Sequence, residues 1–240
     1  MLYNIFMSTI FLSEKTNDLL KSYLREHGHH IIEIKRTNAV YDAVSSHADI
    51  YLCRIGKELI VSGEQLPMIF EELERCGIAF STGCAKLGHD YPDNVKYNGA
   101  QVGDYFIHNI KITDPELIHA AEYFSLKMIH VSQGYTKCNL VIVDDHSVIT
   151  SDSGIYKALT AQKIDVLLIS KGHVALHGFP YGFLGGASGR VGNEILFNGD
   201  LSAHPDFKTI KNFIRERSLQ VRYFVDYPLD DIGSIIKIPG

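Results

Sequence analysis

The sequence lacks the features that would place it in several specialised classes of protein. No apolar run approaches the roughly 18–20 residues that a membrane-spanning helix needs. Positive charge is not in excess, because 23 Lys and Arg against 28 Asp and Glu leave a formal net charge of −5. Hydrophobic residues (45%) and charged residues (21%) are near the globular average, which argues against disorder, collagen and coiled coil. We therefore expect a soluble globular protein with no nucleic-acid or membrane partner.

Cysteine is also scarce. Four cysteines in 240 residues are too few for a disulfide scaffold, and no CxxC pair predicts a zinc site. Residues 1–15, MLYNIFMSTIFLSEK, have a short apolar stretch but no basic leader and no small-residue cleavage site, so we interpret them as a strand rather than a signal peptide. Reduced thiols and a cytoplasmic location are the expectation.

One order of elements recurs along the chain: strand, turn, strand, helix, strand. It is clearest in residues 138–170, where apolar runs at 140–143, 148–150 and 166–170 accompany a helix predicted over 154–162. Further copies are predicted at residues 49–81, 96–132 and 185–225, and a partial copy at 8–35.

The two ends of the chain complement each other. The partial copy at residues 8–35 lacks its opening strand, whereas a spare strand is predicted over 234–238. Pairing these segments closes an α/β ring of five ββαβ units around a pseudo-fivefold axis, which leaves no open sheet edge. No low-complexity linker interrupts the chain, so residues 1–240 are expected to form a single domain. The alternative is a generic α/β sheet whose similar units merely reflect alternating strands and helices.

Such a ring resembles the pentein fold, which includes arginine and agmatine deiminases, dimethylarginine dimethylaminohydrolase, amidinotransferases and non-catalytic members. His47-Ala48-Asp49-Ile50 is similar to the His-x-Asp at the head of a strand in the deiminases. Residues 134–138, GYTKC, are similar to their Gly-rich approach to a nucleophilic cysteine. Residues 178–189, GFPYGFLGGASG, together with His47 and Lys137-Cys138, are similar to a bacterial family known mainly by this fold.

The sequence also departs from the enzymes of that superfamily. Their catalytic cysteine heads the closing strand near the C-terminus, where this chain has Ser234. Their His-x-Asp belongs to the unit that begins here with Cys138, two units after the one that begins with His47. The resemblance therefore implies a centre for a guanidine or amidine, but roles cannot be copied by position.

The heads of the first strands converge on the axis of such a ring. We expect Cys138 to be the nucleophile, with His47 and Asp49 as the base and its orienting carboxylate, since residues two apart on a strand share a face. Lys137 would then point away from the thiol. The alternatives are an inert buried cysteine and a core histidine. Further substrate contacts are expected at the other predicted heads, namely Asn98, Asn139, Gly186, Ser188 and Ser234.

Acidic residues end the second strands, at Glu14, Glu64, Asp152 and Asp200. Because each precedes a predicted helix, helix capping explains them better than ligand binding. The minority interpretation is that Asp152 or Asp200 binds a guanidinium group. We expect no cofactor and no resident metal, because His47 and Asp49 have ligand-like spacing without a third ligand.

Three functions remain open from the sequence. The leading hypothesis is a hydrolase or deiminase that cleaves a C–N bond of a small guanidine or amidine by covalent catalysis at Cys138. The second is a catalytically inactive binding protein for a small cationic ligand or a protein partner, which Ser234 in the usual cysteine position favours. The third is metal-assisted hydrolysis near His47 and Asp49. Residues 84–95, rich in Gly, His and Asp, are a candidate lid.

Overall fold

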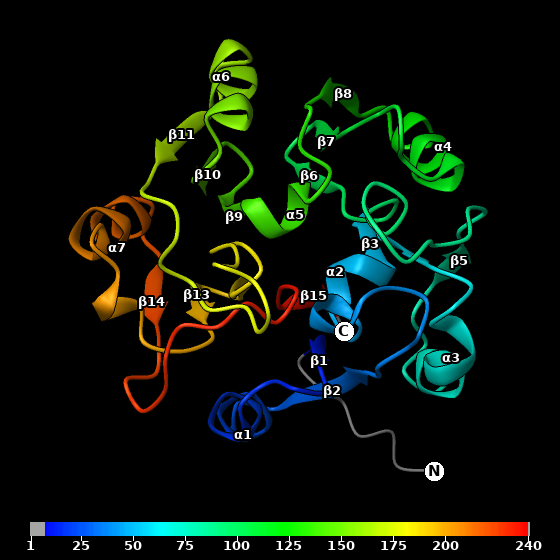
Figure 1. The fold of residues 1–240 in the computed structure, drawn as a ribbon, viewed down its shortest axis with the longest axis horizontal. Helices are drawn as coiled ribbons and strands as arrows, with labels where there is room; N and C mark the ends of the chain where they lie inside the picture. The colour runs from blue at the N-terminus through cyan, green and yellow to red at the C-terminus, as the bar shows by residue number, and fades with distance from the viewer. Residues whose placement is uncertain (1–7, 240) are drawn as a thin grey trace.

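The computed structural model describes residues 8–239, whose strands form five three-stranded sheets of one common topology (Figure 1). In each sheet the first strand is antiparallel to the second, and the second is parallel to the third. A helix joins the second and third strands in every sheet. Each sheet with its helix is therefore one ββαβ unit, as the repeat predicted.

Short runs rich in β-branched, aliphatic and aromatic residues form these strands. The first strands are β3 (Leu52–Ile55), β6 (Ala100–Val102), β9 (Val141–Asp144), β12 (Ser188–Val191) and β15 (Ile236–Pro239). The second strands are β4 (Glu58–Val61), β7 (Tyr105–His108), β10 (Ser147–Thr150), β13 (Glu194–Phe197) and β1 (Ser8–Ser13). The third strands are β5 (Phe80–Thr82), β8 (Lys127–His130), β11 (Asp165–Leu168), β14 (Gln220–Arg222) and β2 (His29–Ile34).

The helices that join second and third strands lie at the periphery of the view in Figure 1. Asn17, Asp114 and Asp152 cap three of them by accepting hydrogen bonds from backbone N–H groups of the first turn. The five helices that join second and third strands are α1 (Asp18–Glu26), α3 (Leu66–Arg75), α4 (Pro115–Tyr123), α6 (Ser153–Ala161) and α7 (Phe207–Arg215).

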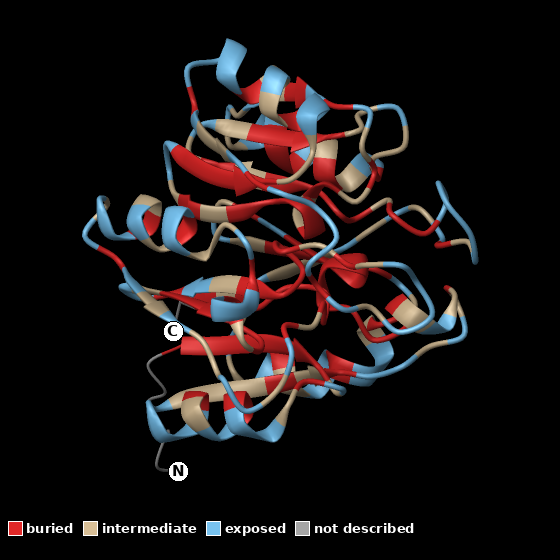
Figure 2. Cartoon of the chain, turned by 60° about the vertical axis from the view of Figure 1, so that its left-hand side comes forward, coloured by how far each residue is buried: buried red, intermediate tan, exposed pale blue. Residues whose placement is uncertain are grey.

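Burial follows the position of each strand within its sheet. Every residue of β1 and β10, two of the second strands, is buried, whereas β11 and β14, two of the third strands, contain no buried residue. Figure 2 shows the same gradient, with buried strands inside and helices whose outer faces are exposed. Burial of apolar side chains on β1 and β10 therefore contributes more to folding than burial on β11 and β14.

The first strands of different sheets also meet. β3 contacts β6, and β12 contacts both β9 and β15. All five first strands contribute residues to one cavity of about 500 Å³. The last strand, β15, is antiparallel to β1, with Ile238 opposite Thr9, so the C-terminal strand completes the N-terminal unit as predicted.

Two strand heads differ from the sequence prediction. A helical turn, α2 (Ala48–Tyr51), occupies the start of the unit predicted at residues 49–81, where its first strand was expected. A second one, α5 (Thr136–Asn139), precedes β9. Two 3-10 turns, η1 (Asp42–Val44) and η2 (Leu201–Ala203), complete the secondary structure of residues 8–239. Across the same residues, no helix has the length and apolar character needed to cross a membrane.

Candidate functional site

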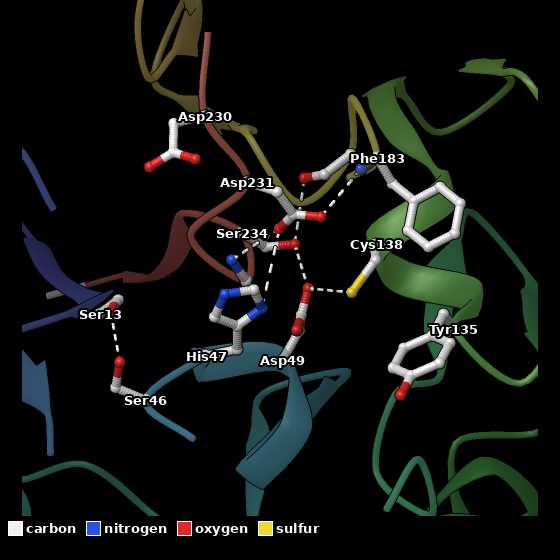
Figure 3. A network of polar contacts seen from close by, with 12 residues as sticks. Ser13, Ser46, His47, Asp49, Tyr135, Cys138, Phe183, Asp230, Asp231 and Ser234 are labelled. Atoms are coloured by element: carbon white, nitrogen blue, oxygen red, sulfur yellow. Dashed lines mark hydrogen bonds and ion pairs between the residues drawn. The ribbon is translucent and has the colours of Figure 1, made fainter. Parts of the chain in front are cut away.

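A chain of buried polar contacts joins the heads of three first strands (Figure 3). Cys138 Sγ donates to Oδ2 of Asp49 over 3.0 Å, and Ser234 Oγ donates to the same oxygen over 2.6 Å. The three side chains are buried. The structure therefore brings together three residues that the sequence had placed at separate strand heads.

Helical turns, not strands, position two of these residues. Asp49 lies in α2, and its backbone N–H donates to the backbone oxygen of Gly233 at 3.0 Å. Cys138 lies in α5. The expectation that His47 and Asp49 share one face of a strand is therefore wrong. The His47 ring lies beside a different carboxylate, with Nδ1 3.7 Å from Oδ1 of Asp231.

Asn98 holds the thiol and the carboxylate together. Its Nδ2 donates to Cys138 Sγ at 3.2 Å and to the backbone oxygen of Asp49 at 3.0 Å. Its Oδ1 accepts from the backbone N–H groups of Lys137, at 2.8 Å, and Cys138, at 3.3 Å. Since the Asn98 side chain is fully buried, these four bonds fix α5 relative to α2.

Lys137 also reaches the network, contrary to the expectation that it points away. Its Nζ donates to Ser234 Oγ at 3.1 Å. A helical turn aims successive side chains about 100° apart rather than at opposite faces, so the strand argument did not apply. Burial lowers the pKa of the Lys137 ammonium, while the charge of Asp49 acts in the opposite direction.

Asp231, for which the sequence predicted no role, also belongs to the site and lies beside His47. Its carboxylate accepts from the backbone N–H groups of Phe183, at 2.9 Å, and Gly233, at 3.0 Å. Burial, followed by the nearby charge of Asp49, raises the pKa of Asp231 to about 7. The available signal was its position three residues before Ser234, at the head of the same closing strand.

Two polar atoms of the site have no hydrogen-bond partner among the described residues. They are Oδ1 of Asp49 and Nδ1 of His47, and both are buried. Burial lowers the pKa of His47 to about 4, so its imidazole is neutral at neutral pH. Burial also raises the pKa of the Cys138 thiol well above its ordinary value, and the charges of Asp49 and Asp231 raise it further. The site thus combines a protonated thiol, a neutral imidazole and two carboxyl groups.

Close backbone approach keeps these groups together. A Cβ on Gly186 would lie 2.0 Å from Oδ1 of Asp231, and one on Gly233 would lie 2.1 Å from Cβ of His47. Gly233 has a φ of +72°, and the next residue, Ser234, has a φ of +69°, a conformation that is strained for a residue with a side chain. The segment that carries Asp231 and Ser234 is therefore held in one tight conformation.

Aromatic side chains lie next to this network. Tyr135 contributes its ring beside Cys138 in Figure 3, and its hydroxyl hydrogen-bonds that of Tyr41 at 2.7 Å. Tyr91 stacks on Tyr135 with ring centroids 5.9 Å apart. Because Tyr91 belongs to residues 84–95, the candidate lid lies against the aromatic residues that adjoin the thiol.

Three more of the predicted contact residues lie close to the site. The backbone N–H of Gly186 donates to Cys138 O at 2.8 Å. Asn139 Nδ2 donates to the backbone oxygen of Tyr135 at 2.9 Å, and Ser188 Oγ donates to that of Gly185 at 3.3 Å. The side chains of Asn139 and Ser188 therefore form hydrogen bonds with nearby backbone oxygens in this structure.

The acidic residues at the ends of the second strands have different partners. Asp152 caps α6, and Asp200 accepts from a backbone N–H of η2, so neither joins the network around Cys138. Glu14 and Glu64 instead accept from backbone N–H groups of Arg36 and Leu87. Helix capping was thus the correct interpretation for Asp152, and it is wrong for Glu14 and Glu64.

A group with metal-ligand geometry lies elsewhere. In the part of the chain that the structure describes, His30, Glu72 and Cys76 place three ligand atoms within 4.8 Å of one another. The guanidinium group of Arg75 already binds the Glu72 carboxylate, which opposes a second cation there. The group includes neither His47 nor Asp49.

The sequence matches the family described as a family of unknown function, DUF6873, over residues 11–236. The chain belongs to the DUF6873 family. No curated protein matches it.

Solved structures show the fold of this DUF6873 chain to be that of the penteins. A cysteine-to-serine variant of DDAH from Pseudomonas aeruginosa, complexed with citrulline, has 10% identity and a TM-score of 0.59, with 98% of this chain and 100% of that chain covered. The agmatine deiminase of C. jejuni has 8% identity and a TM-score of 0.60, with coverage of 100% and 95%. The N-terminal domain of ArgZ, a cyanobacterial arginine dihydrolase bound to its product, has 10% identity and a TM-score of 0.53, with coverage of 91% and 90%.

Proposed function

We propose that this protein binds a small cationic guanidine or amidine between Asp49 and Asp231 and hydrolyses one of its C–N bonds through covalent catalysis by Cys138. The observation that carries the proposal is the buried Oδ1 of Asp49, which has no partner among residues 8–239, on a carboxylate whose Oδ2 lies 3.0 Å from the Cys138 thiol. One structurally similar enzyme is complexed with citrulline, whose side chain ends in a urea, the kind of product that hydrolysis of a guanidine gives.

Charge and hydrogen-bond geometry support a cation. A planar guanidinium or amidinium group offers several N–H donors, which match the paired oxygens of a carboxylate. In a buried site the attraction between unlike charges is stronger than in water. The ligand would also provide the partner that Oδ1 of Asp49 lacks, which removes the cost of a buried unsatisfied acceptor.

Ligand charge would also activate the nucleophile. The thiol of Cys138 is protonated in the unliganded protein because burial and two carboxylates oppose the thiolate. A cation beside Asp49 and Asp231 offsets those charges and lowers the pKa of the thiol. Productive deprotonation of Cys138 would therefore be coupled to binding of the substrate.

The proposed reaction has two steps. In the first, Cys138 Sγ forms a bond to the central carbon, its proton passes to Oδ2 of Asp49, and that proton is transferred to the nitrogen that leaves as ammonia or amine. In the second, water attacks the same carbon and gives one proton to the neutral His47, the C–S bond breaks, and His47 returns that proton to the thiolate. The other proton of the water molecule leaves the product oxygen and protonates the released ammonia or amine. The products are an amine and a urea or amide, and Cys138 is regenerated.

The arrangement of the units supports a closed ring. We infer that the five ββαβ units close a ring about a pseudo-fivefold axis within one domain over residues 1–240. The pairing of β15 with β1, and the contribution of all five first strands to one cavity, support this inference. A reducing compartment such as the cytoplasm, expected from the sequence, would keep Cys138 as a thiol.

One observation favours a second candidate function. The Cys138 thiol is buried and protonated, and the sequence resemblance predicts that Ser234 stands where the deiminases have their cysteine. A protein that binds the same cation without turnover would have these properties. Thermal stabilisation by ligand without product release would identify it.

The test combines turnover and binding. Purified protein is incubated with arginine, agmatine and methylated arginines, and released ammonia or amine is measured together with the thermal shift. The proposal expects release from at least one compound, its loss in Cys138→Ala, and retained activity in the matched control Cys53→Ala, another buried free cysteine. Binding without release supports the second candidate, and neither binding nor release rejects both.

A further inference from the structure

The cavity between the first strands lies beyond the site described above. The site uses residues at or before the heads of these strands, such as Asp49 and Ser234, whereas the cavity is lined by the strands themselves and by the hairpin turns that follow them. Its volume is about 500 Å³. The proposed function assigns nothing to it.

Four cationic side chains from different parts of the sequence line this cavity: Lys137 from α5, Arg54 from β3, Arg190 from β12 and Lys237 from β15. Three of them are close in space. The Nη1 of Arg54 donates to the backbone oxygen of Lys237 at 3.2 Å. Burial, and then the positive charges of Arg54 and Arg190, lower the pKa of Lys237.

Arg54, Arg190 and Lys237 have no carboxylate partner among the described residues, whereas the charges of Asp49 and Asp231 act on Lys137. Within residues 8–239, none of the four forms an ion pair, whereas Lys21 and Arg222, elsewhere in the protein, each lie within 3.3 Å of a glutamate oxygen. Arg54 and Arg190 donate only to backbone oxygens. Grouping like charges without counterions costs free energy, which an anion in the cavity would offset.

The acidic residues of the cavity do not balance this charge. Asp144 and Asp145 are the two carboxylates in its lining. Asp144 already accepts from Ser147 and the backbone of His146, and Arg217 lies 3.8 Å from its other oxygen. Asp145 is exposed at the turn. Lining cations therefore outnumber lining carboxylates by two to one, with one of those carboxylates partly neutralised.

We infer that this cavity is a binding site for a small polyanion, a metabolite that carries at least two carboxylate or phosphate groups. Two guanidinium forks, Arg54 and Arg190, suit bidentate contacts with such groups, and Lys237 adds a point charge between them. The volume exceeds what a single phosphate needs. This site differs in charge and place from the proposed cation site, although Lys137 borders both, through its bond to Ser234 on one side.

Calorimetric titration of the full chain tests the inference. Pyrophosphate represents ligands with phosphate groups, and citrate represents ligands with carboxylate groups. Titration with each one shows which kind of anionic group the cavity binds. We expect at least one of them to bind at low salt and to weaken as salt is added. The single variants Arg54→Gln, Arg190→Gln and Lys237→Gln should each weaken binding about tenfold, and Arg54→Gln with Arg190→Gln about a hundredfold.

The control is Lys57→Gln, an exposed lysine of the same β3–β4 hairpin that does not line the cavity. It should bind the polyanion like the natural protein. Cys138→Ala should also bind it normally, which separates this inference from the proposed function. The inference is overturned if neither polyanion binds up to about 10 mM, or if folded variants, checked by circular dichroism, bind as tightly as the Lys57→Gln control.

Discussion

Cys138 Sγ and Asp49 Oδ2 are 3.0 Å apart although 89 positions separate the two residues in the sequence. A carboxylate that accepts from a thiol raises the pKa of that thiol, so the contact favours the protonated nucleophile. The same carboxylate has a second oxygen without a partner among the described residues. Under the proposed function, a cation would pair with this second oxygen.

Replacement of Asp49 by asparagine should weaken binding of the cationic ligand about a hundredfold, because it removes a buried charge that faces the ligand. Turnover should fall at least as much, since the acceptor of the thiol proton is also lost. Titration calorimetry and product assays measure the two effects. Asp145→Asn, at an exposed turn, is the matched control and should change neither. Equal affinities in Asp49→Asn and in the control would contradict the proposed site.

The charge of an alkylating reagent should determine how fast it reacts with Cys138. We expect 2-chloroacetamidine, a cation, to alkylate Cys138 faster than 2-chloroacetamide, its neutral analogue, because the cation is attracted by Asp49 and Asp231. Exposed Cys84 should show the two reagents' intrinsic reactivities and serves as the internal reference. Peptide mapping by mass spectrometry gives both rates. The same reagent preference at Cys84 and Cys138 would argue against a cation site beside the thiol.

Binding of a cationic guanidine should tighten as pH rises. The pKa of Asp231 is raised to about 7, so its carboxyl is mostly neutral at pH about 6 and mostly ionised at about 8, while the guanidine stays charged throughout. The dissociation constant should therefore fall up to about tenfold over this range. Asp231→Asn should flatten the profile. Asp230→Asn, whose carboxylate points away from the site in Figure 3, should retain it. A flat profile in the natural protein would show that Asp231 does not contact the ligand.

A side chain at Gly186 should disturb both stability and the site. The new Cβ of Gly186→Ala would lie 2.0 Å from Oδ1 of Asp231, so we expect a loss of about 3 kcal/mol in the free energy of unfolding and weaker cation binding. Gly63→Ala is the control, because nothing lies within 4 Å of its Cβ. It should change stability by less than about 0.5 kcal/mol. Urea denaturation measures both, and equal stabilities would show that the Gly186 segment is free to move.

Local patterns predicted most of the architecture. Apolar runs, turn residues and helix starts act over a few residues, so the five ββαβ units and the spare C-terminal strand could be read from the sequence. The conformation at the heads of β3 and β9 could not be predicted in this way, because a single helical turn of four residues is too short to show a helical period in the sequence. That error reversed the predicted direction of Lys137 and placed His47 and Asp49 on one face of a strand that is a helical turn in the structure.

The sequence by itself determined the repeat and the supply of chemical groups: a thiol, an imidazole, amides and carboxylates at or near strand heads. Only the tertiary structure decided which of them meet. It joined Cys138 to Asp49 and Ser234, paired His47 with Asp231, and gathered Arg54, Arg190 and Lys237 around one cavity. The physical reason is that periodicity encodes local conformation, whereas contacts between units depend on how strands far apart in sequence pack against one another.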